Sequence, residues 1–189
     1  IVAENKREDT YKQIRAEIAK GRQAYVICPR INEPDPEKEM ALIAKSAKAE
    51  AERLQKKIFT DLTVGLVHSK LLPKAKDEVM ASFTAGEIDI LVATSVIEVG
   101  VNVPNATIII IEGAERFGLA QLHQLRGRVL RSNHQAYCYL FTNTKNVKSF
   151  ARLKALKTAK NGFELAELDL ALRGAGLLSG EKQWGISDL

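Results

Sequence analysis

The chain has 189 residues, 27% of them charged, and a formal net charge of +5. This composition is typical of one soluble globular domain with an appendage, and the positive charge permits a polyanionic partner without proving one. Its two cysteines, Cys28 and Cys138, each sit alone in an apolar run. Their spacing excludes a disulfide framework or a cysteine metal site and favours buried thiols in a reducing cytoplasm. The sequence has no signal-like opening and no apolar run of about 18 residues, so it supports neither export nor membrane spanning.

Helices and short apolar strands alternate over most of the chain. We expect helices over 10–20, 37–59, 73–83 and 119–126, and strands over 23–28, 64–67, 88–93, 107–111 and 136–141. The segment 29–37 holds three prolines and is expected to be a loop. Runs such as IDILVA and TIIII are apolar on both faces of a strand, which predicts a buried, mostly parallel sheet with helices on both faces. The fold class is therefore α/β.

The last part of the chain has a different pattern. A basic helix is expected over 146–160 and a second helix, with acidic and apolar residues, over 162–173. The run RGAGLLSGEKQWG that follows has four glycines in thirteen residues, which indicates a loop. We expect an α/β domain over 1–144 and a helical hairpin with a terminal loop over 145–189.

A cluster of arginines stands in the run QLHQLRGRVLRS, at positions 121–132. If the helix that starts near Leu119 continues through the cluster, Arg128 and Arg131 lie one turn apart on the same face. Two guanidinium groups on one face suit the oxygens of a transferring phosphoryl group. A surface basic patch or a salt-bridge cluster is the alternative, and Arg126 belongs to the same cluster. His123 and His134 are expected to be structural or surface residues.

A second segment, VATSVIEVGVNVPNA at 92–106, directly follows an expected strand. Thr94 and Ser95 stand at the carboxyl end of that strand, where hydroxyls and backbone amides can reach a phosphate. Gly100 allows a ligand to approach the backbone closely, and Asn102 offers an amide to a ribose or to an arginine. An ordinary turn is the alternative explanation of this segment.

Together the two segments resemble motifs V and VI of superfamily-two helicases. The G-x-D-x-P element of that family reads here as GVNVP, with Gly100 and Asn102, and its Q-x-x-G-R-x-x-R element runs from Gln124 to Arg131. The longer stretch from ILVATSVIEVG to QLRGRV is similar to the RecG branch, with the transcription-repair coupling factor Mfd as its nearest relative. The terminal FELAELDLALRGAGLLSGEKQWG resembles the translocation motif of both branches. The resemblance covers nearly the full chain.

The resemblance implies a RecA-like lobe and a role for each matching residue. Arg128 and Arg131 are expected to be arginine fingers, with Gly100, Asn102 and Gln124 also at the nucleotide. The residues expected to contact the DNA backbone are His68, Thr94 and Ser95. The residues expected to couple nucleotide hydrolysis to DNA movement are Arg173 and Gln183. No metal ligand is expected in this chain.

The chain contains neither a P-loop nor an acidic quartet that could hold magnesium. The resemblance implies that ATP with Mg²⁺ binds mainly to an N-terminal RecA-like lobe of a longer protein, and we expect this chain, which does not begin with methionine, to be a fragment of it. The chain alone is expected to be inactive in ATP hydrolysis. The expected partners are that lobe, a wedge domain, and branched or duplex DNA. The resemblance also implies a monomer in the bacterial cytoplasm, associated with the nucleoid.

The sequence departs from the family pattern at several positions. Asn102 replaces the usual aspartate, Leu130 the glycine between the finger arginines, and Ser69 the glycine after a histidine. Lys182 and Trp184 replace the usual arginine and serine of the terminal loop. We expect Leu130 to require a local packing adjustment. Two other functions stay open: the translocase lobe of a transcription-repair coupling factor, and a nucleic-acid-binding module that has lost motor activity.

Overall fold

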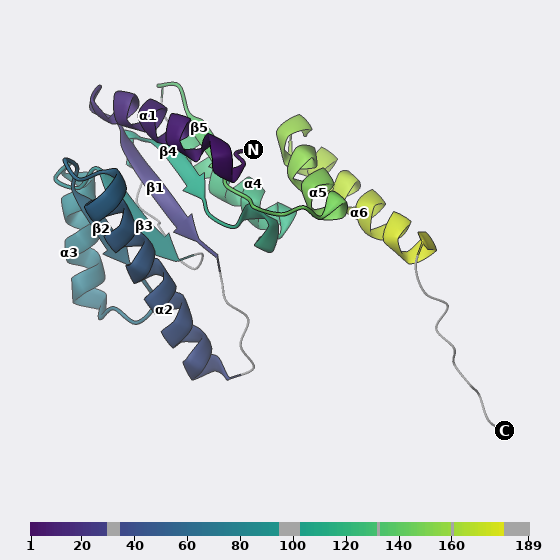
Figure 1. The fold of residues 1–189 in the computed structure, drawn as a ribbon, viewed down its shortest axis with the longest axis horizontal. Helices are drawn as coiled ribbons and strands as arrows, with labels where there is room; N and C mark the ends of the chain where they lie inside the picture. The colour runs from purple at the N-terminus through teal and green to yellow at the C-terminus, as the bar shows by residue number, and fades with distance from the viewer. Residues whose placement is uncertain (30–34, 95–102, 132, 160, 180–189) are drawn as a thin grey trace.

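The chain folds around a five-stranded parallel sheet with the strand order β2-β3-β1-β4-β5 (Figure 1). The computed structural model describes residues 1–29, 35–94, 103–131, 133–159 and 161–179. Register is parallel in each of the four strand pairs, which confirms the predicted parallel sheet. The strands are β1 (Gln23–Cys28), β2 (Val64–Val67), β3 (Ile90–Thr94), β4 (Ala106–Ile111) and β5 (Tyr137–Leu140).

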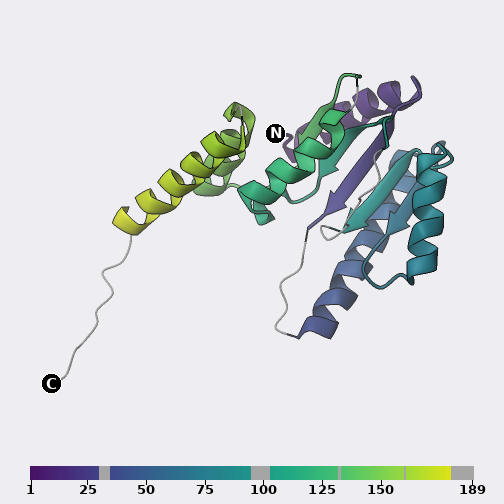
Figure 2. The ribbon, with the colours of Figure 1, turned by 180° about the vertical axis from the view of Figure 1, so that it is seen from behind.

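Side chains of the central strands alternate between two hydrophobic cores, one on each face of the sheet. On β1, Tyr25 and Ile27 belong to one core, and Ala24, Val26 and Cys28 belong to the other. Every residue of β1, β3 and β4 is buried, as expected for a parallel sheet that is covered on both faces. Figures 1 and 2 show the covering helices from opposite sides.

The helices are divided between the two faces. Helix α1 (Arg7–Ile18) and helix α2 (Pro36–Arg53) pack on the face of Ala24. On the Tyr25 face lie α3 (Pro73–Thr84) and α4 (Leu119–Arg128), and α5 (Val147–Thr158) and α6 (Gly162–Ser179) pack against α4 and extend the same core. Short turns complete the description: η1 (Glu4–Lys6), η2 (Leu54–Ile58), η3 (Ala114–Arg116) and η4 (Val129–Arg131). Among the described helices, none is both long and apolar enough to cross a membrane.

The long helix predicted over 37–59 is divided in the structure. It begins at Pro36, where the Asp35 side chain accepts hydrogen bonds from the backbone N–H groups of Glu37 and Lys38. The α-helix ends at Arg53, and the chain continues as the wider π-helical turn η2, closed by a 2.7 Å bond from Phe59 N–H to Leu54 C=O. Leu54 and Phe59, five residues apart, are both fully buried. The wider turn brings both side chains onto the same core-facing side.

The helix with the clustered arginines runs back across the sheet from the carboxyl ends of the strands to their amino ends. β4 ends at Ile111, and β5 starts at Tyr137 beside Ile108, so the chain between them must return to the amino edge. The predicted helix over 119–126 extends as α4 to Arg128 and continues as the 3₁₀ turn η4. Arg128 and η4 therefore lie toward the amino ends of the strands.

The predicted C-terminal hairpin is present, and its second helix is longer than expected. Helix α6 continues through Gly174 and Gly176 to Ser179, so the prediction that the loop begins at Arg173 was wrong for residues 173–179. Each glycine disfavours a helix by only about 1 kcal/mol, and the alanine and leucines around them are good helix formers. Residues 180–189 lie outside the described part of the chain. Both hairpin helices pack against α4.

Candidate functional site

The arginines of α4 lie in different environments. Arg126 is half-buried: its Nη1 donates a 2.8 Å hydrogen bond to Leu156 C=O in α5, and its Nη2 lies 3.0 Å from Nδ1 of His123. Arg128, two residues later, is exposed at the end of the helix. Arg131 ends the turn η4. Arg126 therefore fixes α4 to the hairpin, and Arg128 stands where a ligand from outside the lobe can reach it.

The expected spacing of Arg128 and Arg131 assumed that the α-helix continues through the cluster, but the α-helix ends at Arg128. The turn after Arg128 is 3₁₀, in which residues three apart are eclipsed, so the two arginines remain one turn apart along the chain. The expectation for Leu130 was wrong. Its side chain is 60% exposed, so the residue that replaces glycine requires no packing adjustment.

The two helicase-like segments meet at the amino ends of the strands. Val103, in the first segment, and Val129, which directly follows Arg128, belong to the same hydrophobic core, and the turn η4 contacts β4. The charge of Arg128 also acts on Tyr25 in β1: burial raises the pKa of Tyr25 to about 12, and Arg128 opposes that rise. Gly100 and Asn102 lie outside the described residues.

Gln124 faces a groove between α4 and α6. The groove encloses about 470 Å³, and most of its lining is apolar. Gly162 starts α6 directly against His123, because a Cβ atom on Gly162 would come within 3.3 Å of His123 Nε2. His123 thus packs between α4 and the start of α6, as expected for a structural histidine. The residues that line the groove are Leu119, Ala120, His123, Gln124, Gly162, Leu165, Ala166, Asp169 and Leu170.

At the carboxyl ends of the strands, His68 lies in a group of lysines. It directly follows Val67, which pairs with Ala93 of β3, so His68 and Thr94 come from the same end of neighbouring strands. Burial and the positive charges of Lys76, Lys48 and Lys70 lower the pKa of His68 below its ordinary value. Its Nδ1 is buried and makes no hydrogen bond to the described residues. An anion placed here would meet positive charge from three separate segments.

Thr94 is placed differently from His68. It ends β3, as predicted, but only 1% of its surface is exposed. A direct contact from its side chain to DNA would require more exposure than the structure gives it. Ser95, which follows it, lies outside the described residues, as does Gln183. Arg173 is placed only as a residue of α6.

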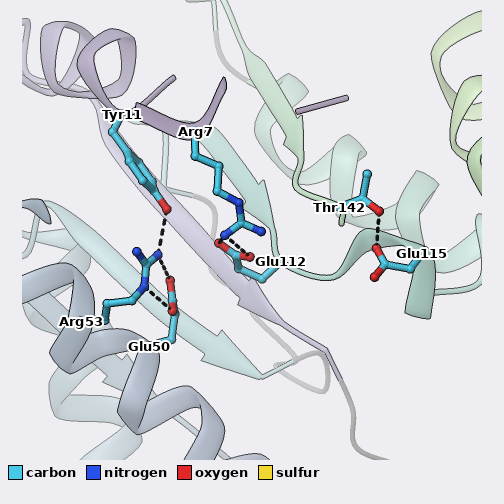
Figure 3. Close-up of polar contacts among 7 residues, drawn as sticks. All are labelled: Arg7, Tyr11, Glu50, Arg53, Glu112, Glu115 and Thr142. Atoms are coloured by element: carbon cyan, nitrogen blue, oxygen red, sulfur yellow. Dashed lines mark hydrogen bonds and ion pairs between the residues drawn. The ribbon is translucent and has the colours of Figure 1, made fainter. Parts of the chain in front are cut away.

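Between the carboxyl ends of β1 and β4 lies a network of ion pairs that the sequence did not reveal (Figure 3). Arg7 contacts Glu112 at 3.1 Å, and Arg53 contacts Glu50 at 2.7 Å and the Tyr11 hydroxyl at 2.8 Å. These residues come from α1, α2 and the end of β4, so no local motif signals them. The four charged residues, Arg7, Glu50, Arg53 and Glu112, line a cavity of about 450 Å³.

In an open α/β sheet, the point where the strand order reverses is where ligands bind, and here it falls between β1 and β4. Three carboxylates, those of Glu50, Glu112 and Glu115, line this place together with the guanidinium groups of Arg7, Arg53 and Arg116. Burial raises the pKa of Glu112, while the nearby charge of Arg7 lowers it. The hydroxyl of Thr142 donates a 2.5 Å hydrogen bond to Glu115. The ion pairs Arg7–Glu112 and Arg53–Glu50 thus lie at the place where an open α/β sheet usually binds a ligand.

The model of the helicase conserved C-terminal domain matches residues 5–133. The chain belongs to this family. Among curated relatives, it is 45% identical to the ATP-dependent DNA helicase RecG of Synechocystis sp. over 188 residues, which is 100% of this chain and 22% of that protein. RecG of Thermotoga maritima is 43% identical and is matched over 99% of this chain and 23% of that protein. The chain thus spans under a quarter of the length of these two relatives.

Solved structures agree with this membership. A RecG structure bound to a three-way DNA junction aligns with a TM-score of 0.74 and 40% identity, over 94% of this chain and 22% of that chain. Domain 2 of the DEAD-box helicase Mss116p, bound to an RNA duplex, aligns with a TM-score of 0.60 and 18% identity, over 90% of this chain and 67% of that chain. The second match shows the fold alone. The predicted RecG-type, RecA-like C-terminal helicase lobe is confirmed.

Proposed function

We propose that this chain is the C-terminal motor lobe of an ATP-dependent DNA helicase that remodels branched DNA in repair and recombination. The observation that carries the proposal is the position of Arg128, which is exposed at the end of α4. The junction-bound RecG structure supports branched DNA as the substrate. The division at residue 144 between the α/β lobe and the hairpin belongs to the same proposal.

ATP with Mg²⁺ would bind mainly to an N-terminal lobe of the full-length protein. When the cleft between the lobes closes, Arg128 and Arg131 would reach the γ-phosphate and stabilise the charge that develops on it. Gln124, one helical turn before Arg128, would help to position the nucleotide, together with Gly100 and Asn102. Within the described part of the chain, no cluster of three or more His, Cys, Asp or Glu residues could hold a metal ion.

The DNA backbone would run along the carboxyl ends of the strands. His68 with Lys48, Lys70 and Lys76 forms its best-supported contact, because their charges converge there and His68 Nδ1 has no partner among the described residues. Contacts of this kind position a strand without reading its bases. Ser95 belongs to the same proposed contact, and Thr94 stays in it only if its side chain becomes exposed.

Movement of the lobe would reach the DNA through the hairpin. Helix α6 packs along α4, the helix of the proposed fingers, so a shift of α4 moves α6 with it. Arg173 and Gln183 would then link this movement to duplex DNA. We also propose that the full-length protein acts as a monomer in the bacterial cytoplasm, close to the nucleoid.

The proposal is tested by comparing two forms of the protein. The full-length protein is expected to hydrolyse ATP when branched DNA is added, whereas this chain alone is expected to show no hydrolysis above a protein-free control. The reason is that the γ-phosphate site is completed by two lobes. Release of inorganic phosphate measures both rates, and circular dichroism confirms that the isolated chain is folded. Hydrolysis by the folded isolated chain would refute a site divided between two lobes.

A histidine contact to phosphate should depend on pH. Burial and nearby lysines hold the pKa of His68 below 6.5, so it is neutral at pH 7 in the free protein. The neutral form is favoured by folding, so its contribution to stability is present above pH 6.5 and is lost as the pH falls through the folded-state pKa. A DNA phosphate favours the protonated form instead. DNA binding should therefore take up a proton and become tighter as the pH falls below 6.5.

The measurement is DNA affinity of the full-length protein as a function of pH. Replacing His68 with glutamine should weaken binding roughly tenfold at low pH, as expected for loss of a charge-assisted hydrogen bond, and much less at pH 8 or so. His134→Gln, at an exposed position, is the control. Equal losses at both pH values would argue against a protonated His68 at the phosphate.

A further inference from the structure

Helix α5 exposes a stripe of apolar and basic side chains that the proposed motor does not use. Val147, Phe150, Ala151 and Lys154 are three or four residues apart, so they lie on one side of the helix. Val147 is 82% exposed and Phe150 is 37% exposed. The opposite side of the helix, with Leu153 and Leu156, is buried in the core. The stripe is therefore left at the surface by the packing of α5.

The stripe borders a hollow of about 260 Å³, which we call the α5 hollow. It is lined by Thr144, Lys145, Val147, Phe150, Ala151 and Lys154. The ammonium group of Lys154 lies 5.2 Å from the centre of the Phe150 ring, so a flat aromatic surface and a positive charge stand side by side. The lining residues include two lysines and no carboxylate. Helix α5 itself contains basic residues and no acidic residue.

The α5 hollow lies at the same edge of the sheet as His68. Each strand ends at this edge, where His68 follows β2, and Thr144 and Lys145 follow β5 shortly before α5. β2 and β5 are the two outer strands, four strand spacings apart. With about 4.8 Å between neighbouring strands, the edge is about 19 Å wide. A strand of DNA that contacts His68 and continues along this edge would reach the α5 hollow.

We propose that the α5 hollow binds an unpaired nucleotide of the DNA substrate, with its base against Phe150 and Val147 and its phosphates between Lys145 and Lys154. A nucleotide combines a flat apolar base with adjacent negative charge, and the hollow offers the complement of both. Base stacking on an aromatic side chain within a basic groove is a general mode of single-strand binding. The inference rests on the proposed DNA-binding function and adds a second contact surface to it.

A comparison within the chain supports nucleic acid as the occupant. Helix α6 also exposes an aromatic ring, Phe163, which is 75% exposed, and Leu170, which is 72% exposed. Acidic residues Glu164 and Glu167 stand next to Phe163, and α6 has no basic residue in its last turn. The exposed aromatic of α5 thus has lysines beside it, whereas that of α6 has carboxylates. Of these two rings, only that of Phe150 has beside it the positive charge that suits a phosphate.

The test measures binding of the full-length protein to fluorescent oligothymidylate and to a duplex of equal length, with no ATP added. Phe150→Ala should weaken binding to the single strand at least about fivefold, as loss of one base stack implies. Phe150→Leu keeps the apolar packing and should lose a similar amount, whereas Phe150→Tyr should bind like the parent protein. Lys145→Ala with Lys154→Ala should lower the slope of log affinity against log salt by about 1.4. Circular dichroism and thermal unfolding confirm that each variant is folded.

Matched controls separate this surface from general effects. Phe163→Ala removes a more exposed ring from α6, and Lys12→Ala removes an exposed charge from the opposite face of the sheet; both should bind like the parent protein. Parent-like binding by Phe150→Leu, or an unchanged salt slope in the double lysine variant, would overturn the proposal. Loss that appears equally for the duplex would also overturn it. Because the assay contains no ATP, these outcomes stand even if the full-length protein proves not to be an ATPase.

Discussion

Replacing Arg128 with alanine in the full-length protein is expected to lower DNA-stimulated ATP hydrolysis by about three to five orders of magnitude, the effect of removing an arginine finger. The reason is that Arg128 is exposed at the end of α4 and would meet charge that develops only in the transition state. Binding of ATP itself should change little. Phosphate release measures hydrolysis, and a fluorescent ATP analogue measures binding.

Three further variants make this result specific. Arg128→Lys keeps the charge without the planar pair of donors, and it should recover only part of the activity. Arg126→Ala should act on stability, because it removes the bond to Leu156 that holds α4 to α5. Lys12→Ala, which removes an exposed positive charge on α1, on the opposite face of the sheet from α4, should hydrolyse ATP like the parent protein. Normal turnover by folded Arg128→Ala would refute the finger assignment.

Replacing Phe141 with alanine is expected to lower the free energy of unfolding of this chain by about 3–5 kcal/mol, as for other fully buried phenylalanines. Phe141 directly follows β5 and is 0% exposed. Its ring packs edge-on against Tyr11, with centroids 5.7 Å apart, and the Arg7 guanidinium lies 4.7 Å from its centre. Its loss would leave a cavity beside the ion pair of Arg7. Urea denaturation followed by circular dichroism measures the change.

The same substitution at an exposed position is the control. Phe163→Ala should change the free energy of unfolding by less than about 0.5 kcal/mol, because the ring is mostly in solvent. Phe141→Leu fills most of the cavity and should fall between the two. A loss at Phe141 no larger than that at Phe163 would contradict the packing described around Tyr11 and Arg7.

Local sequence patterns were sufficient to predict most of the helices and strands. The strands at 23–28 and 64–67 have the predicted bounds. The first is buried on both faces, so its apolar run marks its full length. Gly21 lies just after α1 and has the positive φ of 82° that favours glycine at the end of a helix. The glycines of α6 gave a misleading signal, since a local preference of about 1 kcal/mol is easily outweighed by the residues around them.

Ligands of an open α/β sheet bind at the carboxyl ends of its strands, and this expectation covers only part of the proposed site. His68, which follows β2, lies at that edge, and the segment that leads to the α5 hollow follows β5 there. The proposed fingers lie toward the other edge, because α4 crosses the sheet before it reaches Arg128. No property of residues 121–132 alone says where that helix points. Its direction depends on which strand follows and on which side that strand pairs.

The arginine cluster summarises what the sequence determined and what the tertiary structure decided. The sequence determined the family and the α/β fold, because spacing and side-chain polarity are local properties, and it placed three arginines within six residues. Only the tertiary structure distinguished Arg126 from Arg128, because the packing of α5 supplies Leu156 C=O to one and leaves the other at the surface. The ion pair between Arg7 and Glu112 was beyond local reasoning for the same reason. Its residues are 105 positions apart and meet only when the sheet forms.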